Sequence, residues 1–513
     1  MSDWNSGYVA DIGYTHGFYR ELTPVVLEFV ATSKGLRSPD SAGAITYCEL
    51  GCGQGYSANL LAAANPHIQF HATDFNPAHI VGAQALAREA GTENVHFYDD
   101  AFADFLERPE LPQFDVISLH GIYTWIAAEH RATIVEFIRR KLKPGGLVYI
   151  SYNCLPGWSP AAPMRHLMYL HGKAQGGPTI GRLDPALAFI EKMIGAEAKY
   201  FVANTALKAR QESLTKQNKN YLAHEYLNDA WTLFYHSDVA AELGEAKLGY
   251  LGSANVLDHI DAVNFTADQK AIMDGITDPI LRETVRDYIV NQQFRRDVFS
   301  KGAIPLTDSA RREAWLEQRF ALTVARADVS MKIRGGIGEA DLHADVYAPI
   351  LDALAAGPTT VRQLVDGTPA VAALGWNRLA EALVILVGSG QVQPCLPARG
   401  DAQRKKHTKA FNSAVLKHAR DNADFQNLAS PVTGGGIPMS RFQQLFLLAQ
   451  EQGRKTADDC AQFAWDVLQA QGQAILKEGK PLNSPEENLA ELKSQAATFF
   501  EKIIPLLRQL QIV

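Results

Sequence analysis

The chain has 513 residues, of which 47% are hydrophobic and 20% charged, and its 49 basic and 56 acidic side chains give a formal net charge of −7. This composition is ordinary for a globular protein and argues against disorder, and the length predicts two or three domains. The acidic balance gives no support for binding a polyanion, so we expect no nucleic-acid partner. No stretch approaches the roughly 18 apolar residues of a membrane span, so no membrane partner is expected, and the N-terminus lacks the pattern of a signal peptide.

The cysteines are few and scattered along the chain. They are Cys48, Cys52, Cys154, Cys395 and Cys460. Cys48 and Cys52 are four apart, but no second pair or histidine cluster completes a zinc site, so no metal is expected. We expect buried free thiols and a reducing, cytoplasmic setting.

Strands and helices alternate in the first third of the chain. Strands are predicted at 44–50, 68–73, 95–98, 114–119 and 147–152, and helices at 56–64, 77–90 and 129–141, with a turn at KPGG (143–146). Strands separated by helical segments of this length indicate βαβ units and a parallel sheet. The predicted fold class is therefore α/β, with a Rossmann-like sheet.

The pattern changes after residue 153. Residues 160–235 are predicted to be mainly helical, followed by a helix at 239–244 and strands at 248–251 and 294–300. We therefore expect a helical insertion before the last strands, with the sheet finishing only near residue 300.

The remaining chain is predicted to be mainly α-helical. Helices at 346–356, 361–366 and 376–388, with a strand at 391–395, indicate a winged-helix-like module. Its third helix has Arg378 as its only basic residue, which favours packing or protein contact over DNA binding. ASPVTGGGIP at 429–438 is predicted to be a loop, and the chain beyond it helical. The expected domains are 1–160, 161–304, 305–400 and 401–513.

A glycine loop, ELGCGQG at 49–55, follows the first predicted strand. Gly51, Gly53 and Gly55 allow a ligand to approach the backbone, and the next helix offers free N–H groups. The dinucleotide fingerprint places its third glycine one residue later. Glu49 opens the loop; a carboxylate repels a pyrophosphate but suits a ligand with an amino group and a sulfonium. S-adenosylmethionine carries both charges, so it is the expected cofactor, and an NAD-dependent reductase is the fallback.

Two further acids follow the next two strands. Asp74, beside Phe75, is placed to accept the ribose hydroxyls, and Asp100, followed by Ala101, to accept from the adenine amine. Each acid alone is explained equally well as a helix N-cap. Together with Glu49 they converge on one crevice at the carboxyl ends of the strands, which favours the cofactor interpretation.

This layout resembles the class I S-adenosylmethionine-dependent methyltransferases over roughly residues 40–152, most specifically at ELGCGQG, ATDFNP and LKPGGLVYIS. A narrower resemblance covers most of residues 1–300 and is carried by YVADIGYTHGFYRELTP, HGIYTWI, SYNCLPGW and NYLAHEYLNDAW. It is to bacterial methyltransferases with a methyltransferase regulatory domain, a group that includes rickettsial protein-lysine methyltransferases acting on outer-membrane proteins.

The resemblance implies positions for the cofactor and a class of acceptor. Glu49 would lie by the methionine amino group, residues 51–55 under the methionyl and ribose parts, Asp74 on the ribose and residues 100–101 at the adenine. The implied acceptor is protein lysine, in one version an outer-membrane or surface protein before its export. A homodimer stays open.

Methyl transfer is an in-line displacement that requires an aligned, neutral nucleophile and exclusion of water. The candidates on the acceptor side are His120, Tyr123, Trp125, Tyr152, Asn153 and Trp158. His120 has a usable proton-transfer range, or it bonds a loop carbonyl or caps the adenine pocket. The aromatic side chains form a cage for an alkylammonium or pack in the core. SLHG at 118–121 is not the (N/D)PPY motif, which disfavours nucleic-acid bases and glutamine as acceptors.

Two features outside the sheet have two interpretations each, and a third is rejected as a site. Tyr14, together with Tyr8, His16 and Tyr19, forms either a lid over the cofactor or one face of an amphipathic helix. Arg165 binds a substrate anion or forms an exposed helix salt bridge. His224 and the glutamate after it lack the second histidine of H-E-x-x-H, so a metalloprotease site is rejected.

Two other functions remain beside a protein-lysine acceptor. One is methylation of a glycan or of a small-metabolite hydroxyl or amine. The other is a non-catalytic adaptor that binds adenosylmethionine as a sensor and uses the winged-helix-like module to contact a partner.

Overall fold

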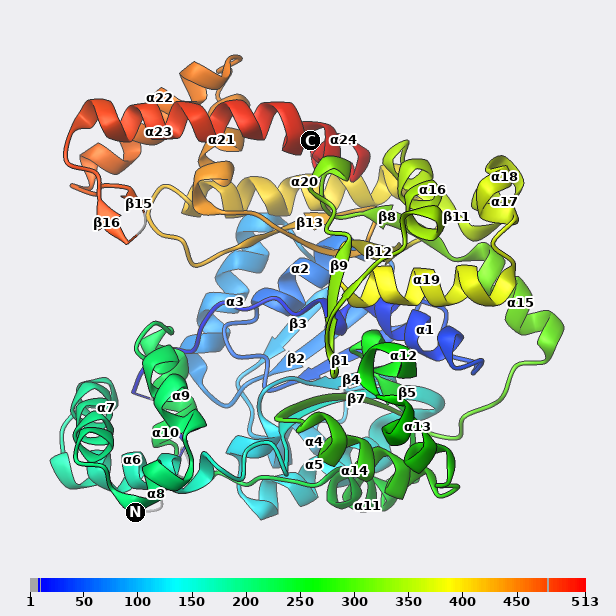
Figure 1. The fold of residues 1–513 in the computed structure, drawn as a ribbon. Helices are drawn as coiled ribbons and strands as arrows, with labels where there is room; N and C mark the ends of the chain where they lie inside the picture. The colour runs from blue at the N-terminus through cyan, green and yellow to red at the C-terminus, as the bar shows by residue number, and fades with distance from the viewer. Residues whose placement is uncertain (1–7, 10, 478) are drawn as a thin grey trace.

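The computed structural model describes residues 8–9, 11–477 and 479–513. At its centre lies a seven-stranded sheet with the order β3-β2-β1-β4-β5-β7-β6 (Figure 1). The strands are β1 (Thr46–Leu50), β2 (Gln69–Thr73), β3 (Val95–Tyr98), β4 (Phe114–Leu119), β5 (Leu142–Asn153), β6 (Gly249–Ser253) and β7 (Phe294–Ser300). Strands β1 to β5 pair in parallel, and β7 is antiparallel to both β5 and β6. The predicted α/β class is confirmed, and the sheet does finish at residue 300.

Helices cover both faces of this sheet. On one face lie α1 (Pro24–Ser33), α2 (Tyr56–Ala64) and α3 (Pro77–Ala90), and on the other α4 (Phe102–Leu106), α5 (Ala128–Lys141) and α11 (His236–Gly244). Strand β1 shows the reason, because Tyr47 packs into the first core while Cys48 and Leu50 pack into the second. Burial on both faces is typical of a parallel sheet.

The KPGG turn predicted at 143–146 is instead the first part of β5, which runs unbroken from Leu142 to Asn153. Gly145 has a positive φ of 81°, and the pairing of β4 with β5 shifts register between Phe114 and Val116. A Cβ on Gly146 would lie 2.9 Å from the carbonyl oxygen of Asp115. The glycines therefore allow an irregular strand start to pair closely with β4.

The segment between β5 and β6 is helical and has a small core of its own (Figure 1). Its helices are α6 (Ala162–Gln175), α7 (Thr179–Gly195), α8 (Lys199–Ala203), α9 (Ala206–Leu214) and α10 (Lys219–Leu227). Between β6 and β7 follow α12 (Asp261–Asn264), α13 (Ala267–Asp274) and α14 (Pro279–Val290). The helical insertion expected before the last strands is present.

Residues beyond 305 form the remaining, mainly helical part. It contains α15 (Asp308–Glu317), β8 (Arg319–Leu322), β9 (Lys332–Gly335), β10 (Gly338–Asp341), α16 (Ala344–Ala355), β11 (Thr359–Thr360), α17 (Val361–Gly367), α18 (Pro369–Ala372), α19 (Trp376–Gly388) and β12 (Val392–Cys395). It continues with α20 (Asp401–His418), β13 (Asn427–Ser430), β14 (Gly435–Pro438), α21 (Arg441–Glu451), α22 (Ala457–Ala470), β15 (Leu476–Lys477), β16 (Lys480–Pro481), α23 (Pro485–Thr498) and α24 (Ile504–Gln509).

The three helices and the strand expected of a winged-helix module are present as α16, α17, α19 and β12. However, β12 pairs with β8, which precedes the first of these helices, and β11 pairs with the other edge of β8. The strand after the third helix thus obtains its partner from earlier in the chain, and the structure does not confirm a wing. The domain boundaries at 160, 304 and 400 stay predictions.

The loop predicted at 429–438 is wrong, because this segment forms most of the β13–β14 hairpin. A Cβ on Gly435 would lie 2.7 Å from Thr23 Oγ1, and one on Gly436 would lie 2.8 Å from Phe18 Cδ1. The glycines therefore permit close packing against the N-terminal part of the chain. The hairpin also contacts α2, which follows the glycine loop.

No helix of the described ranges is both long enough and apolar enough to cross a bilayer.

Candidate functional site

The glycine loop between β1 and α2 has a conformation that only glycine adopts readily. Gly51, Gly53 and Gly55 all have positive φ, at 71°, 53° and 65°. A Cβ on Gly51 would lie 2.8 Å from Ile122 Cγ2, and one on Gly55 would lie 2.4 Å from Ala83 Cβ. The loop is therefore held by its neighbours in a form that leaves its backbone open to a ligand.

Two cavities border this loop, and a third adjoins them. The apolar cavity is lined by Tyr8, Gly51, Asp74, Phe75, Asp100, Ala101, Phe102, Ile122, Trp125, Ile126, Ala127 and His130. The loop cavity is lined by Tyr8, Tyr14, Thr15, Gly17, Tyr19, residues 51–54, Glu49, Tyr56, Ser57, Asp74, His79, residues 120–122 and Trp125. The aromatic cavity is lined by Tyr14, Tyr19, His120, Gly121, Thr124, Trp125, residues 151–153, Trp158, Arg210, Tyr221, Glu225, Gln293, Phe294 and Arg296. Trp125 lines all three, so the cavities are neighbours around this side chain.

Glu49 supplies a buried acid to the loop cavity. Its Oε2 has no hydrogen-bond partner among the residues that the structure describes. Burial, followed by the charge of Asp74, raises the pKa of Glu49 to about 8. A buried carboxyl without a partner is costly unless a ligand satisfies it, and a cation is the group that favours its ionised form. The geometry therefore fits a ligand ammonium at Glu49.

Asp74 borders both the loop cavity and the apolar cavity. Its Oδ2 accepts from Gly53 N at 2.9 Å, and its Oδ1 accepts from Asn76 N at 3.0 Å and lies 3.1 Å from His79 Nδ1. The N-cap of α3 is Asn76, whose side chain accepts from Ala78 N. Asp74 thus joins the glycine loop to the start of α3, and its carboxylate retains some capacity to accept from a ligand.

The third acid of the predicted crevice, Asp100, has a partner within the chain. Arg108 donates to Asp100 Oδ1 through Nη2 at 3.1 Å and to Oδ2 through Nε. Thr73 Oγ1 donates to the backbone carbonyl of Asp100 at 2.8 Å. Phe75 and Ala101 line the same apolar cavity, as expected. No motif indicates the partner, Arg108, which reduces the free acceptor capacity of Asp100.

Residues 11–19, which we call the N-terminal strap, cross the loop cavity. They form no helix, so the helix interpretation of Tyr14 and its neighbours is wrong. Gln54 Nε2 donates to Tyr14 O at 3.3 Å, and Ser57 Oγ donates to Gly17 O at 2.9 Å. These bonds attach the strap to the glycine loop and to α2, so Tyr14 and Tyr19 form part of the cavity wall.

His120 directly follows β4, and it lines both the loop cavity and the aromatic cavity. Its Nδ1 is 2.8 Å from Tyr149 Oη, and its ring stacks on Tyr19 with centroids 3.5 Å apart. Burial, with a smaller contribution from the nearby Arg296, lowers the pKa of His120 to about 3. The imidazole is therefore neutral at pH 7 and too weak a base to take a proton from an acceptor.

The other acceptor-side candidates divide into two groups. Trp125, Asn153 and Trp158 line the aromatic cavity, and Tyr152 contributes to it while its hydroxyl donates to Asp297 at 2.6 Å. Tyr123 does not line any of the three cavities: its ring is buried in the second core and its hydroxyl bonds Glu242. The short 3₁₀ helix at Tyr123–Trp125 separates the two side chains, so that Trp125 lines the cavities and Tyr123 does not.

Glu225, which lines the aromatic cavity, was not among the acceptor-side residues predicted from the sequence. Asn153 Nδ2 and Trp231 Nε1 donate to its Oε1 at 2.7 and 2.9 Å, and Trp125 Nε1 donates to Oε2 at 3.2 Å. Burial raises its pKa to about 7, while these donors and Arg165 oppose the rise. A carboxylate offers about four acceptor positions, so one remains for a ligand.

Arg165 has neither of its predicted roles. It is 5% exposed, and its guanidinium donates to the backbone carbonyls of Glu225 and Asn228. It also lies over the ring of Trp231. Arg165, which lies on α6, therefore attaches the end of α10, and with it Glu225, to α6.

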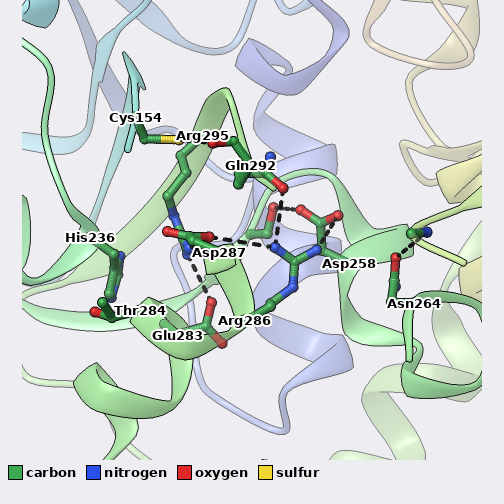
Figure 2. A network of polar contacts seen from close by, with 12 residues as sticks. Cys154, His236, Asp258, Asn264, Glu283, Thr284, Arg286, Asp287, Gln292 and Arg295 are labelled. Atoms are coloured by element: carbon green, nitrogen blue, oxygen red, sulfur yellow. Dashed lines mark hydrogen bonds and ion pairs between the residues drawn. The ribbon is translucent and has the colours of Figure 1, made fainter. Parts of the chain in front are cut away.

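The two faces of β7 serve different purposes. Phe294 and Arg296 face the aromatic cavity, whereas Arg295, between them, enters the buried network in Figure 2. Arg295 there contacts Asp287 at 2.6 Å, Glu283 at 2.8 Å and Asp297 at 2.8 Å. The network fixes α14 to β7 and so positions the cavity face of the strand.

Family models and relatives agree with this architecture. Residues 48–148 match a model described as a methyltransferase domain, and residues 218–301 match a predicted methyltransferase regulatory domain. The Synechocystis sp. protein sll1526 is 46% identical over 509 residues, which cover 99% of both chains. The Rickettsia prowazekii protein RP789 is 26% identical over 319 residues, covering 58% of this chain and 57% of its own.

A solved structure shares the whole fold. PKMT2 from Rickettsia typhi in complex with AdoHcy superposes with a TM-score of 0.72 at 19% identity, covering 98% of this chain and 100% of that one. Its likeness extends through the sheet, the insertion and the C-terminal helices, while both family models match within the first 301 residues. The chain therefore belongs to the class I S-adenosylmethionine-dependent methyltransferases that carry a methyltransferase regulatory domain.

Proposed function

We propose that this methyltransferase transfers the methyl group to the ε-amine of lysine side chains in proteins. The observation that carries the proposal is the aromatic cavity, which adjoins the loop cavity and combines Tyr14, Tyr19 and Trp125 with the buried carboxyl of Glu225. Aromatic rings and a carboxylate are the groups that attract an alkylammonium. The name of PKMT2, which abbreviates protein-lysine methyltransferase, supports the same acceptor class.

The cofactor positions proposed from the sequence fit the residues of the site. Glu49 would hold the amino group, because its buried Oε2 has no partner within the described chain and burial already raises its pKa. Asp74 would meet the ribose, and Phe75 and Ala101 would border the adenine in the apolar cavity. When bound, S-adenosylmethionine supplies a methyl carbon activated by its sulfonium. Every other contribution comes from the chain.

A lysine must lose its proton before its nitrogen can attack. Burial lowers the pKa of an amine and raises that of a carboxyl, so an amine entering the aromatic cavity and Glu225 approach the same pKa. The proton then moves from the amine to Glu225, and the nitrogen lone pair forms the new N–C bond as the C–S electrons return to sulfur. His120 takes no part in this proton transfer, because its pKa of about 3 makes it too weak a base.

The pKa of Glu225 disfavours a hydroxyl group as the methyl acceptor. A sugar or metabolite hydroxyl has a much higher pKa than an ammonium and needs a stronger base than a carboxyl of pKa about 7. A non-catalytic sensor would have no use for a second cavity beside the cofactor site.

The experiment that tests this function is transfer of labelled methyl from S-adenosylmethionine into a fractionated bacterial extract. We expect label in the protein fraction, and much less with the E225Q variant, whose cofactor affinity should be unchanged because Glu225 lines only the aromatic cavity. Label in polysaccharide or in small molecules would support the second acceptor class instead. Tight cofactor binding without any methyl transfer would support the non-catalytic sensor instead.

A further inference from the structure

The aromatic cavity is lined by Arg210, a cation whose role neither the fold nor the cofactor explains. Arg210 lies on α9, in the helical insertion, far from the glycine loop in sequence. It lines the aromatic cavity and neither of the other two. The aromatic cavity shares residues such as Tyr14 and His120 with the loop cavity, and Arg210 is not among them.

Three contacts within the chain hold the guanidinium of Arg210 in place. Its Nε donates to Tyr226 Oη and its Nη1 donates to Gln293 Oε1, both at 3.2 Å. Its Cζ lies 4.0 Å from the centre of the Trp158 ring. A guanidinium has five N–H donors, so these two bonds leave three, while the stack on Trp158 fixes the plane in which they point.

No carboxylate of the described chain forms an ion pair with Arg210. The other two arginines near the cavity differ in this respect. Arg296 pairs with Glu21 at 3.1 Å, and Arg165 is buried on backbone carbonyls. Arg210 is thus a positioned cation with free donors on the wall of a cavity. A fixed guanidinium with several free donors is the arrangement that binds carboxylates in a forked geometry.

We propose that Arg210 is a specificity-determining residue that binds a carboxylate of the acceptor, in the segment that carries the target lysine. This inference rests on the proposed lysine acceptor. Glu225 and Arg210 line the same cavity, where Glu225 suits the amine and Arg210 suits a negative charge beside it. The carboxylate is that of an aspartate or glutamate close to the lysine in sequence. The main-chain carboxylate of a free or C-terminal lysine offers the same chemistry and is separated by the test.

The test uses the full-length enzyme and short peptides with one central lysine. In one series a single aspartate is moved through the positions on either side of the lysine, and in the matched series asparagine stands at the same positions. Free lysine and a peptide ending in lysine are added as separate substrates. The measurement is kcat/KM for transfer of labelled methyl by the wild type, R210Q, R210K and the control R378Q. Arg378 is an exposed arginine on α19 that pairs with Asp345, so its loss matches the change in charge.

We expect the wild type and R378Q to prefer one aspartate position over asparagine by about tenfold or more, as a charge-assisted bond predicts. In R210Q this ratio should fall to about one, and R210K should retain part of it. The ratio is the decisive quantity, because a loss of packing alone would slow both peptide series equally. Rising salt should reduce the preference, since the proposed contact is electrostatic.

Several results would overturn the inference. Equal use of aspartate and asparagine peptides by the wild type, or an unchanged preference in R210Q, would contradict the role of Arg210 and leave lysine methylation intact. Preference for free or C-terminal lysine would assign the carboxylate to the main chain and contradict the flanking acid. If the wild type binds adenosylhomocysteine but methylates no lysine substrate, the proposed function fails, and this inference fails with it.

Discussion

Tyr19 stacks on His120 with ring centroids 3.5 Å apart, at the wall that the loop cavity and the aromatic cavity share. Tyr19 comes from the N-terminal strap and His120 from the end of β4. The strap therefore completes the boundary between the side that suits the cofactor and the side that suits the acceptor.

Removing the ring of Tyr19 should open this boundary. An aromatic pair contributes about 0.5–1.5 kcal/mol beyond burial, so we expect Y19A to weaken adenosylhomocysteine binding severalfold and to slow methyl transfer more strongly. Y19F keeps the stack on His120 and should stay close to the wild type. Calorimetric titration and transfer of labelled methyl measure the two effects. Equal behaviour of Y19A and wild type would mean that the stack has no part in the site.

Glu49 should make cofactor binding depend on pH. With a pKa of about 8 the free carboxyl holds its proton at pH 7, whereas pairing with a ligand ammonium needs the carboxylate. Binding at pH 7 should therefore release a proton, and affinity should rise as the pH increases towards about 8 and then level. Titrations in buffers of different ionisation enthalpy count the proton. E49Q should bind more weakly and lose the pH dependence; an affinity of the wild type that does not change with pH would contradict the proposed ammonium contact.

Asp74 should contribute to cofactor affinity both directly and through the glycine loop. Its carboxylate accepts from Gly53 N and Asn76 N, and it borders the predicted ribose position. We expect D74A to weaken adenosylhomocysteine binding by about 1–3 kcal/mol. The matched control is D115N, because Asp115 pairs with Lys143 away from all three cavities. An unchanged affinity in D74A would remove the ribose assignment.

Glu225 should control the pH dependence of methyl transfer. Its pKa is about 7, so the form that can accept a proton increases as the pH rises through that value. We expect kcat/KM of the wild type to rise over this range, and E225Q to lose the step together with about a hundredfold in rate. Adenosylhomocysteine affinity serves as the control and should not change. A profile of E225Q that keeps the step would assign the proton to another group.

Arg295 should be essential for stability although it does not line the cavities. It contacts Asp287, Glu283 and Asp297 within the buried network. Because its removal leaves buried carboxylates without their cation, we expect R295M to lower the free energy of unfolding by about 3–5 kcal/mol. The control R139M, which breaks an exposed pair with Glu136, should change stability little. Urea denaturation measures both, and equal effects would show that the network adds no more than a surface pair.

The sheet was predictable because its signals are local. Six of the predicted elements, at 56–64, 77–90, 95–98, 114–119, 294–300 and 376–388, have the observed bounds, since apolar runs bounded by glycines or caps indicate a strand or helix without further context. The hairpin at β13–β14 was missed for the opposite reason. Its glycines indicate a loop unless one knows that Thr23 and Phe18, from the other end of the chain, pack against them.

The cofactor side of the site was likewise predictable, whereas the acceptor side was only partly so. Glu49 lies near the end of β1 and Asp74 directly follows β2, so the strand pattern indicates both positions, whereas Arg108, the partner of Asp100, belongs to no motif. Glu225 and Arg210 come from a helical insertion whose orientation no periodicity predicts. Arg295 and Arg296 point to opposite faces of β7, and the sequence does not say which face borders the cavity.

Methylation of lysine side chains is tested most directly by locating the transferred methyl group on the acceptor. Protein labelled by the wild-type enzyme can be digested and the modified residues identified by tandem mass spectrometry, with E225Q as the control. Methyl groups on lysine Nε, much reduced with E225Q, are the predicted result. Methyl groups confined to hydroxyl or carboxyl oxygens, or to non-protein material, would contradict the account.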